Sequence, residues 1–321
     1  MAKDRGLLDL IITRIPGLTA LERGVLCRKF EGEAEITLLS KRDIELILDR
    51  PMPRLWDMDT VRIQAEKDAR GAQIRGIRWV SLVSPEYPPL LREIYDPPVA
   101  LFYRGNLPDP EQPLAAVVGT RRPSPAASAQ AFDIGRFLGA QNIPVVSGLA
   151  LGIDAMAHRG NLEGGAPTIA VLGSGPDEVY PSSNRALARR ILENGGAILS
   201  EYPPGTSPRK WQFPARNRII SALARGTLIV EAPAKSGALI TAQFALEQGR
   251  DLWVASSGAA VGAGNAGTSG TVRGGLSAYG EGTRKLAADG ARIIYSGSDI
   301  LDEWGIRTPQ ILNPKEKNLW Q

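Results

Sequence analysis

The sequence has almost none of the side chains that form disulfides or bind transition metals. Its 321 residues include one cysteine, Cys27, and one histidine, His158. One cysteine excludes an internal disulfide and every metal site that needs several thiolates. One histidine excludes a histidine-pair metal site and leaves a single imidazole for acid–base chemistry. We therefore expect no metal and no other cofactor.

The chain also lacks a long hydrophobic run. No apolar stretch approaches the roughly 18 residues that a membrane span requires, and no signal-peptide core closely follows residues 1–5. We expect no membrane contact and a cytoplasmic location. The composition, with 43% hydrophobic and 22% charged residues, is typical of globular proteins. The length is sufficient for about two domains.

Acidic residues are missing from two stretches. Residues 114–132 and 202–230 contain no aspartate or glutamate, although the net charge of the chain is only +4. The second stretch gathers cations, aromatic rings and an amide in one short segment: Lys210, Trp211, Phe213, Arg216, Asn217 and Arg218. This combination is typical of a surface that holds phosphates and stacks bases. A solvated basic face with packed aromatic residues is the alternative interpretation.

Residues 1–75 are predicted to form a small all-α domain. An Ile-Pro-Gly turn separates a first apolar helix from a second one, and Thr19 and Glu22 form a potential capping box for the second helix. A third helix is expected over residues 37–48. The turn is similar to a helix-hairpin-helix, whose glycine amides can meet a DNA phosphate, but Thr19 replaces the second glycine. A purely structural role is the favoured interpretation.

Residues 76–112 are expected to be an extended, proline-marked connector with a strand, and residues 113–300 an α/β domain. Short apolar strands alternate there with helices, at 115–118, 144–146, 168–172, 197–199, 227–230, 252–255 and 292–294. This alternation indicates an extended Rossmann-type parallel sheet with helices on both faces. Ligands of such sheets bind beyond the carboxyl ends of the strands. The loops after the strands are therefore the candidate site.

A glycine-rich insertion interrupts the alternation. Nine of the 25 residues at 258–282 are glycine, so this segment cannot form a core and is expected to be a mobile loop. The stretch 301–321 is expected to be a C-terminal tail with no winged-helix domain.

The first strand–helix turn carries Gly119, Arg121, Arg122 and Ser124. The glycine allows a sharp turn, and the serine can cap the next helix. A helix N-terminus beside two arginines suits a phosphate. A dinucleotide site would need Gly-x-Gly-x-x-Gly here and an acid about 20 residues further on. Neither is present, which argues against a nicotinamide dehydrogenase.

Two other loops contain residues with potential partners. Asp154 and His158 are four residues apart and can share a helix face. A structural hydrogen bond between them is favoured over an acid–base pair. Glu231 ends a strand and is expected to pair with Arg216 or Arg218, and a helix is expected to start near Ser236.

Taken together, these loops resemble the DNA-processing protein A family (DprA, also called Smf). The resemblance spans residues 79–255. It rests on Gly119-Thr120-Arg121, Ser147-Gly148 with Gly152-Ile153-Asp154 and His158, Leu172-Gly173 with Tyr180-Pro181, Ser200-Glu201-Tyr202-Pro203, Phe213-Pro214 with Arg216-Asn217-Arg218-Ile219-Ile220, and Glu231-Ala232 with Ser236-Gly237 and Leu239-Ile240-Thr241-Ala242. In this order and spacing the motifs are highly specific.

The resemblance implies an extended Rossmann-type domain behind a helical, SAM-like domain. It further implies a homodimer that binds single-stranded DNA, loads the RecA recombinase during natural transformation and recombination, and is not an enzyme. The DNA-binding residues expected from the loops and the resemblance are Gly119, Arg121, Arg122, Ser147, Gly148, Lys210, Phe213, Arg216, Asn217 and Arg218.

The sequence departs from the family pattern at three places. The winged-helix C-terminal domain that some members carry is expected to be absent. Ser257-Gly258 replaces the Pro-Gly after the sixth strand, and Gly282-Thr283-Arg284 replaces a Gly-x-Asn before the last strand. The glycine-rich insertion that follows Ser257-Gly258 puts the local loop and the dimer edge in question, but not the DNA cleft.

Two other function classes remain open. The first is a nucleotide N-glycoside hydrolase of the lysine-decarboxylase-like type, which has a similar core. Its catalytic glutamate would fall at Phe244 if Thr241 is the aligned threonine. The second is a scaffold that binds only an acidic protein.

Overall fold

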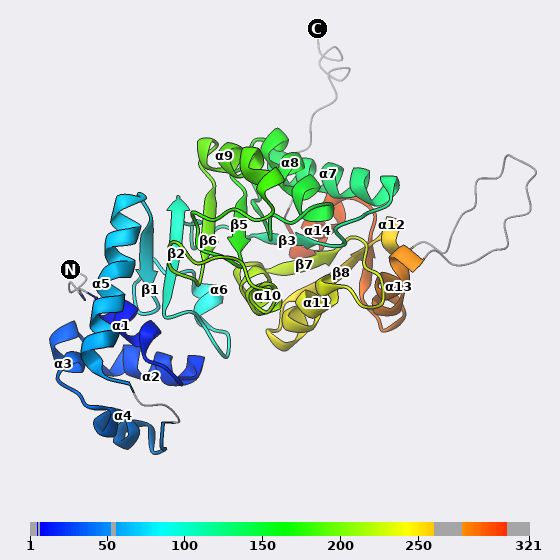
Figure 1. Ribbon diagram of the computed structural model, residues 1–321. Helices are drawn as coiled ribbons and strands as arrows, with labels where there is room; N and C mark the ends of the chain where they lie inside the picture. The colour runs from blue at the N-terminus through cyan, green and yellow to red at the C-terminus, as the bar shows by residue number, and fades with distance from the viewer. Residues whose placement is uncertain (1–4, 6, 53–55, 260–277, 307–321) are drawn as a thin grey trace, which may run out of the picture.

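The computed structural model describes residue 5 and residues 7–52, 56–259 and 278–306 (Figure 1). The expectations for most of the glycine-rich insertion and for the tail beyond residue 306 fall outside the described residues. The described chain forms a helical unit at one end of a nine-stranded mixed sheet with helices on both faces. The predicted α/β fold is therefore confirmed.

The first part of the chain is helical. It consists of α1 (Leu8–Arg14), α2 (Ala20–Lys29), α3 (Glu33–Thr37), α4 (Lys41–Leu48) and α5 (Met58–Ile74). The predicted capping box is present, because the Thr19 amide donates to the Glu22 carboxylate at 2.7 Å and the Glu22 amide donates to Thr19 Oγ1 at 3.3 Å. Arg14 on α1 forms an ion pair with Asp68 on α5. These helices lie beside β1 (Figure 1).

The sheet contains all seven strands that the apolar pattern predicts. Its strands are β1 (Arg78–Ser81), β2 (Ala100–Gly105), β3 (Ala115–Val118), β4 (Val145–Ser147), β5 (Ile169–Leu172), β6 (Ala197–Ser200), β7 (Gly226–Ile229), β8 (Asp251–Ala255) and β9 (Arg292–Ile294), in the order β1-β2-β6-β5-β4-β3-β7-β8-β9. Strands β3 to β9 are parallel. The segment expected to be a connector with one strand supplies two, β1 and β2, which are antiparallel and lie at one edge with α6 (Pro89–Arg92) between them.

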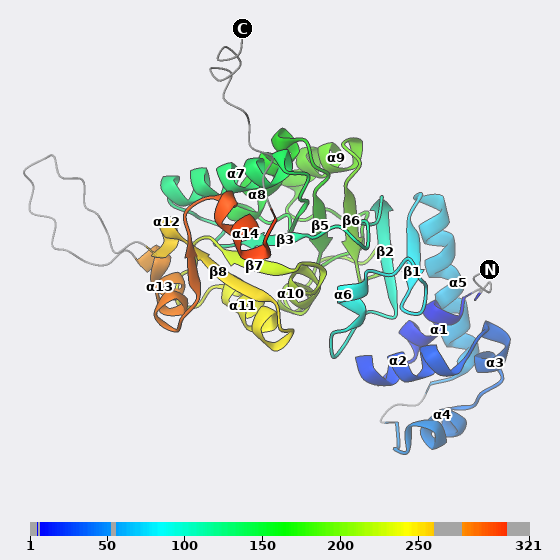
Figure 2. The same cartoon turned by 180° about the vertical axis from the view of Figure 1, so that it is seen from behind.

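Two layers of helices cover the sheet (Figures 1 and 2). One face carries α7 (Pro125–Ala140), α8 (Ile153–Gly164), α9 (Arg185–Glu193) and α14 (Gly297–Trp304), and the other carries α10 (Gln212–Leu223), α11 (Gly237–Glu247) and α13 (Glu281–Ala288). Successive strand residues alternate between these layers. Val117 packs with the core of α7 and α8, whereas Val118 packs with the core of α10. This two-sided burial is the reason why the strands are continuously apolar.

The order of the strands places a crevice between β3 and β7. The chain runs outward from β3 to β6 and then returns to β7 on the other side of β3. The loops after β3 and β7 therefore lead to helices on opposite faces, and the point of divergence is the usual ligand site of such sheets. The Thr120 amide donates to the Glu231 carbonyl at 2.7 Å across this point.

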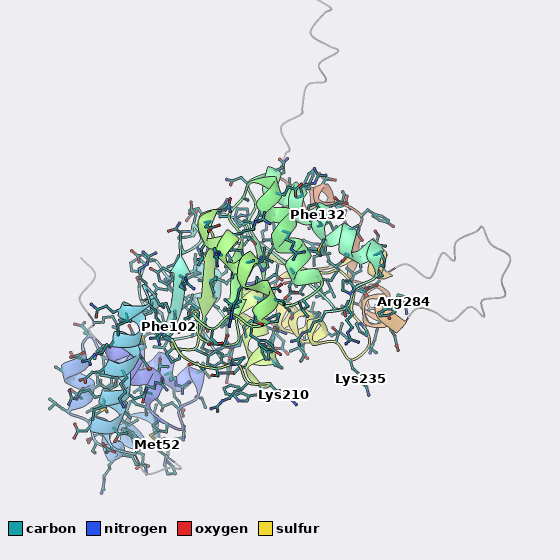
Figure 3. The ribbon with its side chains drawn as sticks, turned by 45° about the horizontal axis from the view of Figure 1, so that its top comes forward. Met52, Phe102, Phe132, Lys210, Lys235 and Arg284 are labelled. Carbon is teal, nitrogen blue, oxygen red and sulfur yellow. The ribbon has the colours of Figure 1, made fainter. Side chains whose placement is uncertain are left out.

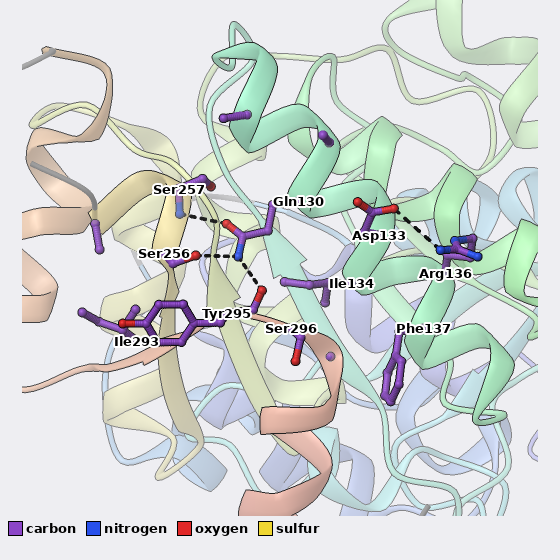
Figure 4. A pocket seen from close by; sticks show the side chains of 14 residues that line it. Gln130, Asp133, Ile134, Arg136, Phe137, Ser256, Ser257, Ile293, Tyr295 and Ser296 are labelled. Atoms are coloured by element: carbon purple, nitrogen blue, oxygen red, sulfur yellow. Dashed lines mark hydrogen bonds and ion pairs between the residues drawn. The ribbon is translucent and has the colours of Figure 1, made fainter. Parts of the chain in front are cut away.

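A glutamine on α7 forms hydrogen bonds with the segments that follow β8 and β9 (Figure 4). Gln130 Nε2 donates to Ser256 Oγ and to the Tyr295 carbonyl, both at 2.9 Å, while its Oε1 accepts the Ser257 amide at 2.8 Å. Ser256 begins the short helix α12 (Ser256–Ala259). A groove of about 850 Å³ lies beside these contacts. The glutamine thus ties the ends of β8 and β9 to α7.

Candidate nucleic-acid interface

A pocket of about 730 Å³ lies at the carboxyl ends of the parallel strands. The loops after β3, β4, β5, β6 and β7 all contribute to it. Its lining includes seven of the ten predicted site residues: Gly119, Arg121, Arg122, Lys210, Phe213, Arg216 and Asn217. Ser147, Gly148 and Arg218 do not line it. Lys210 and Lys235, from the segments before α10 and α11, extend outward at the same edge of the molecule in Figure 3.

The turn after β3 needs a glycine at its first position. A Cβ on Gly119 would lie 2.6 Å from Ile153 Cγ1 and 3.0 Å from the Glu231 carbonyl oxygen, so no larger residue fits. Ser124 caps α7, as predicted, by accepting the Ala127 amide. This turn leaves Arg121 and Arg122 exposed at the rim of the pocket.

Glu231 forms a hydrogen bond with this turn and does not pair with an arginine. Its Oε2 accepts the Ser124 amide at 2.7 Å. The expected ion pair of Glu231 with Arg216 or Arg218 is therefore wrong, because both arginines have other partners. Glu231 is itself buried at the end of β7.

A cation and two aromatic rings form one wall of the pocket. The guanidinium carbon of Arg121 lies 5.7 Å from the ring centroid of Phe213. The centroid of Phe213 lies 5.5 Å from that of Tyr180, with the rings inclined by 40°. Phe213 is half-buried and Tyr180 is exposed, so ring surface remains open to solvent. The stack can receive a further planar group.

For two aromatic residues, the structure differs from the sequence-based prediction of which rings line the pocket. Tyr180 lines the pocket but was not predicted as a site residue, although its place in the loop after β5 was a usable signal. Trp211, which the basic segment suggested as a stacking surface, packs edge-on against Tyr202 at 5.9 Å. It is 59% exposed and lies outside the pocket lining.

Arg216 forms part of the pocket floor. It donates to the Gly148 carbonyl at 2.9 Å and to the Val171 carbonyl. Burial lowers the pKa of the Arg216 guanidinium to about 10, and Asp154 opposes this shift. The side chain therefore remains a cation at neutral pH. It is only 5% exposed, and two backbone carbonyls fix its plane.

Gly148 separates this cation from a buried carboxylate. Asp154 Oδ2 accepts the Gly148 amide at 3.1 Å and the Ala150 amide at 3.3 Å. Burial raises the pKa of the Asp154 carboxyl, while Arg216 and these amides act in the opposite direction. A Cβ on Gly148 would lie 2.6 Å from Arg216 Nη2. A glycine at position 148 is thus required for Arg216 to occupy its place at the bottom of the pocket, although Gly148 itself does not line the pocket.

Arg218 points away from the pocket. Its Nε donates to Asp96 Oδ2 at 2.8 Å, and its two terminal nitrogens donate to both oxygens of Glu201 at 3.0 and 2.6 Å. Although burial disfavours the cation, Glu201 and Asp96 raise the pKa of Arg218 above its ordinary value. The side chain is 6% exposed. The geometry makes it a link between α10, the end of β6 and the segment after α6.

Ser147 and His158 hold the sheet together below the pocket. Ser147 Oγ donates to the Val117 carbonyl at 2.7 Å. Thr168 Oγ1 donates to the Val145 carbonyl, so it accepts from Nδ1 of His158 at 2.7 Å. The expected Asp154–His158 hydrogen bond is not formed among the described residues. Burial lowers the pKa of His158 to about 3, and the Arg216 cation adds to this effect.

One carboxylate lines the pocket within the described residues. It belongs to Asp154, whose Oδ2 accepts two backbone amides. Thr241 of α11 lines the pocket, but Phe244 stands where the hydrolase comparison needs an acid. Over the described ranges, no group of three histidine, cysteine or acidic side chains could hold a metal ion. No helix in those ranges is long and apolar enough to cross a membrane.

Comparison with known proteins identifies the family. The profile of DNA recombination-mediator protein A matches residues 78–305. The chain is 41% identical to DNA processing protein DprA of Streptococcus pneumoniae over 225 residues, which is 70% of this chain and 73% of the relative. It is 36% identical to DNA processing protein DprA of Bacillus subtilis over 242 residues, or 75% of each chain.

Two solved structures extend this comparison. The X-ray structure of DNA processing protein A from S. pneumoniae matches with a TM-score of 0.68 and 35% identity, over 94% of this chain and 95% of that one. The second, of DNA processing protein A from Helicobacter pylori, concerns that protein's unique mode of binding single-stranded DNA. It matches with a TM-score of 0.56 and 27% identity, over 71% of this chain and 95% of that one. The chain with this pocket therefore belongs to the DNA recombination-mediator protein A family.

Proposed function

We propose that the chain binds single-stranded DNA, without regard to sequence, in the pocket at the carboxyl ends of the strands. The observation that carries the proposal is the wall of Arg121, Phe213 and Tyr180 beside Lys210 and Arg122. The cations neutralise phosphates, and the rings stack bases of any identity. The H. pylori relative, which binds single-stranded DNA, supports the same interpretation.

The roles of the predicted residues divide accordingly. Arg121, Arg122 and Lys210 contact phosphates, and Phe213 stacks a base. Gly119, Asn217 and the Arg216 cation lie close enough to contact the strand from the floor. Ser147, Gly148 and Arg218 support this surface from below and do not touch DNA.

Membership of the family suggests a role after DNA has bound. We infer that the chain acts as a cytoplasmic homodimer that passes single-stranded DNA to a RecA-type recombinase during natural transformation and recombination. The family's description as a recombination mediator supports this role. It is tested by adding the chain to RecA and DNA coated with single-strand binding protein. Faster filament formation is expected, and an unchanged rate would contradict the role in loading.

The binding itself is tested by titrating fluorescent oligo-dT at two salt concentrations beside a duplex of equal length. We expect tighter binding of the single strand, because only unpaired bases can stack on Phe213. We also expect affinity to fall steeply with salt. Equal affinity for the duplex would overturn the proposal. Incubation with AMP should release no adenine, and robust release would instead support the hydrolase.

A further inference from the structure

Helix α9 carries three arginines on its exposed surface. Arg185, Arg189 and Arg190 are exposed, and within the described residues their guanidinium groups make no hydrogen bond or ion pair. Some exposed arginines elsewhere have carboxylate partners, as in the ion pairs Arg62–Glu66 at 2.7 Å and Arg75–Asp177 at 2.8 Å, whereas Arg121 and Arg122 at the pocket rim are exposed like those of α9. Arg185 and Arg189 therefore add exposed positive charge to the start of α9, and Glu193 follows Arg189 by one helical turn.

Helix α9 begins near the rim of the pocket. Asn184, the residue before α9, donates to the Leu149 carbonyl at 2.9 Å and to the Ala150 carbonyl at 3.1 Å. Ala150 lines the pocket, and so does Tyr180, which comes just before the turn Ser182–Asn184. The hydrogen bonds of Asn184 thus hold the start of α9 against the loop after β4, one residue of which lines the pocket.

The helix leads away from that rim. Because α9 precedes the parallel strand β6, its N-terminus lies at the carboxyl edge of the sheet and its C-terminus at the opposite edge. Arg185 and Arg189 are four residues apart and share a face, with Cβ atoms about 5–6 Å apart. Leu187, Ala188 and Ile191 anchor the other face in the core. The two cations therefore share the exposed face of a helix that begins five residues after Tyr180.

We propose that Arg185 and Arg189 form an outer track for the DNA strand that occupies the pocket. The track holds phosphates of nucleotides beyond Tyr180 and reads no bases, since it offers charge without an adjoining ring. This inference rests on the proposed function. Continuity with the pocket favours nucleic acid over an acidic protein as the partner, because both surfaces then serve one chain of phosphates.

The test compares the wild type with R185A/R189A on two lengths of oligo-dT. A short oligonucleotide of about 6 nucleotides fills the pocket, and one of about 20 also covers the track. The double variant should bind the long oligonucleotide roughly 3- to 10-fold more weakly, with a salt slope lower by about 1.4, which corresponds to two phosphates of a single strand. Its binding of the short oligonucleotide should be unchanged. The charge-reversed R185E/R189E should show a larger loss on the long oligonucleotide only.

The matched control is K67A/R70A, which removes two exposed cations from α5, the helix beside the edge strand β1. It should bind both lengths as the wild type does. Wild-type affinity and slope of R185A/R189A on the long oligonucleotide would overturn the track, and so would an equal loss on both lengths. Failure of the wild type to bind the short oligonucleotide would instead overturn the proposed function.

Discussion

The guanidinium group of Arg121 lies over the ring of Phe213, 5.7 Å from its centroid. The two residues come from different loops, the turn after β3 and the first turn of α10. Their contact joins the charge that we propose binds a phosphate to the ring that we propose stacks a base. Such preorganisation lowers the conformational entropy that is lost on binding.

Replacing Phe213 should weaken DNA binding without regard to sequence. Phe213→Ala removes the ring between Arg121 and Tyr180. We expect a loss of about 1–3 kcal/mol, or roughly 5- to 150-fold in Kd, in fluorescence anisotropy with oligo-dT. Trp211→Ala is the control, because Trp211 packs on Tyr202 outside the pocket. A larger effect at Trp211 than at Phe213 would contradict this assignment of the wall.

Two substitutions of Arg121 should distinguish the contribution of its charge to DNA binding from that of its planar guanidinium group. Arg121→Ala should lower the salt slope of oligo-dT binding by about 0.7, the value for one phosphate of a single strand. Arg121→Lys keeps the charge but loses the planar group over Phe213. It should keep the wild-type slope while binding more weakly than the wild type. If Arg121→Ala left the slope unchanged, Arg121 would not contact a phosphate.

Arg218 should matter for stability and not for binding. Arg218→Ala leaves Glu201 and Asp96 without their shared cation. We expect the free energy of unfolding in urea to fall by about 2–4 kcal/mol, somewhat below the usual cost for a fully buried pair. The reason is that the Asp96 side chain is 39% exposed.

The control for the variant Arg218→Ala is a substitution that breaks an exposed ion pair on α5. Arg62→Ala breaks the pair with Glu66 and should cost less than about 1 kcal/mol. The folded Arg218→Ala protein should bind oligo-dT as the wild type does. A stable variant with impaired binding would restore Arg218 as a DNA contact, which is what the sequence alone suggested.

The free energy of unfolding should decrease as the pH is lowered from 6.5, because of the single histidine. The pKa of His158 is about 3 in the folded protein, against 6.5 for an ordinary histidine. Below pH 6.5 the unfolded chain gains a proton that the folded protein does not accept, so protonation favours unfolding. Between pH 6.5 and 5 the free energy of unfolding should fall by roughly 1–2 kcal/mol. Urea unfolding of His158→Gln should show a flatter profile, and identical slopes would show that His158 is not responsible.

The positions of the strands, and the edge of the sheet at which most of the candidate residues meet, were predictable from the sequence. Strands buried on both faces form continuous apolar runs, and parallel strands bring the loops after them to one edge. Loops as distant as those of Arg121 and Lys210 could therefore be assigned to one surface. The predicted caps at Thr19 and Ser124 are also present, and α11 starts at Gly237, as predicted, because these features depend on neighbouring residues alone.

The partners of buried charges were not predictable in this way. Arg216 and Arg218 both looked like DNA contacts, and nothing in the sequence connects Arg218 with Asp96, which lies 122 positions away. One signal was nevertheless available. Residues two apart on a helix point about 200° apart around its axis. Once α10 was predicted, the two arginines could not both face the pocket.

The contact of Glu231 with Thr120 and Ser124 has a consequence for folding. It joins the turn after β3 to the end of β7 across more than a hundred positions of the chain. Loop-closure entropy makes such distant pairings slow to form. A fragment that ends before β7 would have the arginine turn but not its anchor. Oligonucleotide binding by a refolding chain would therefore report completion of the central sheet, and truncation series could use it as a signal of native topology.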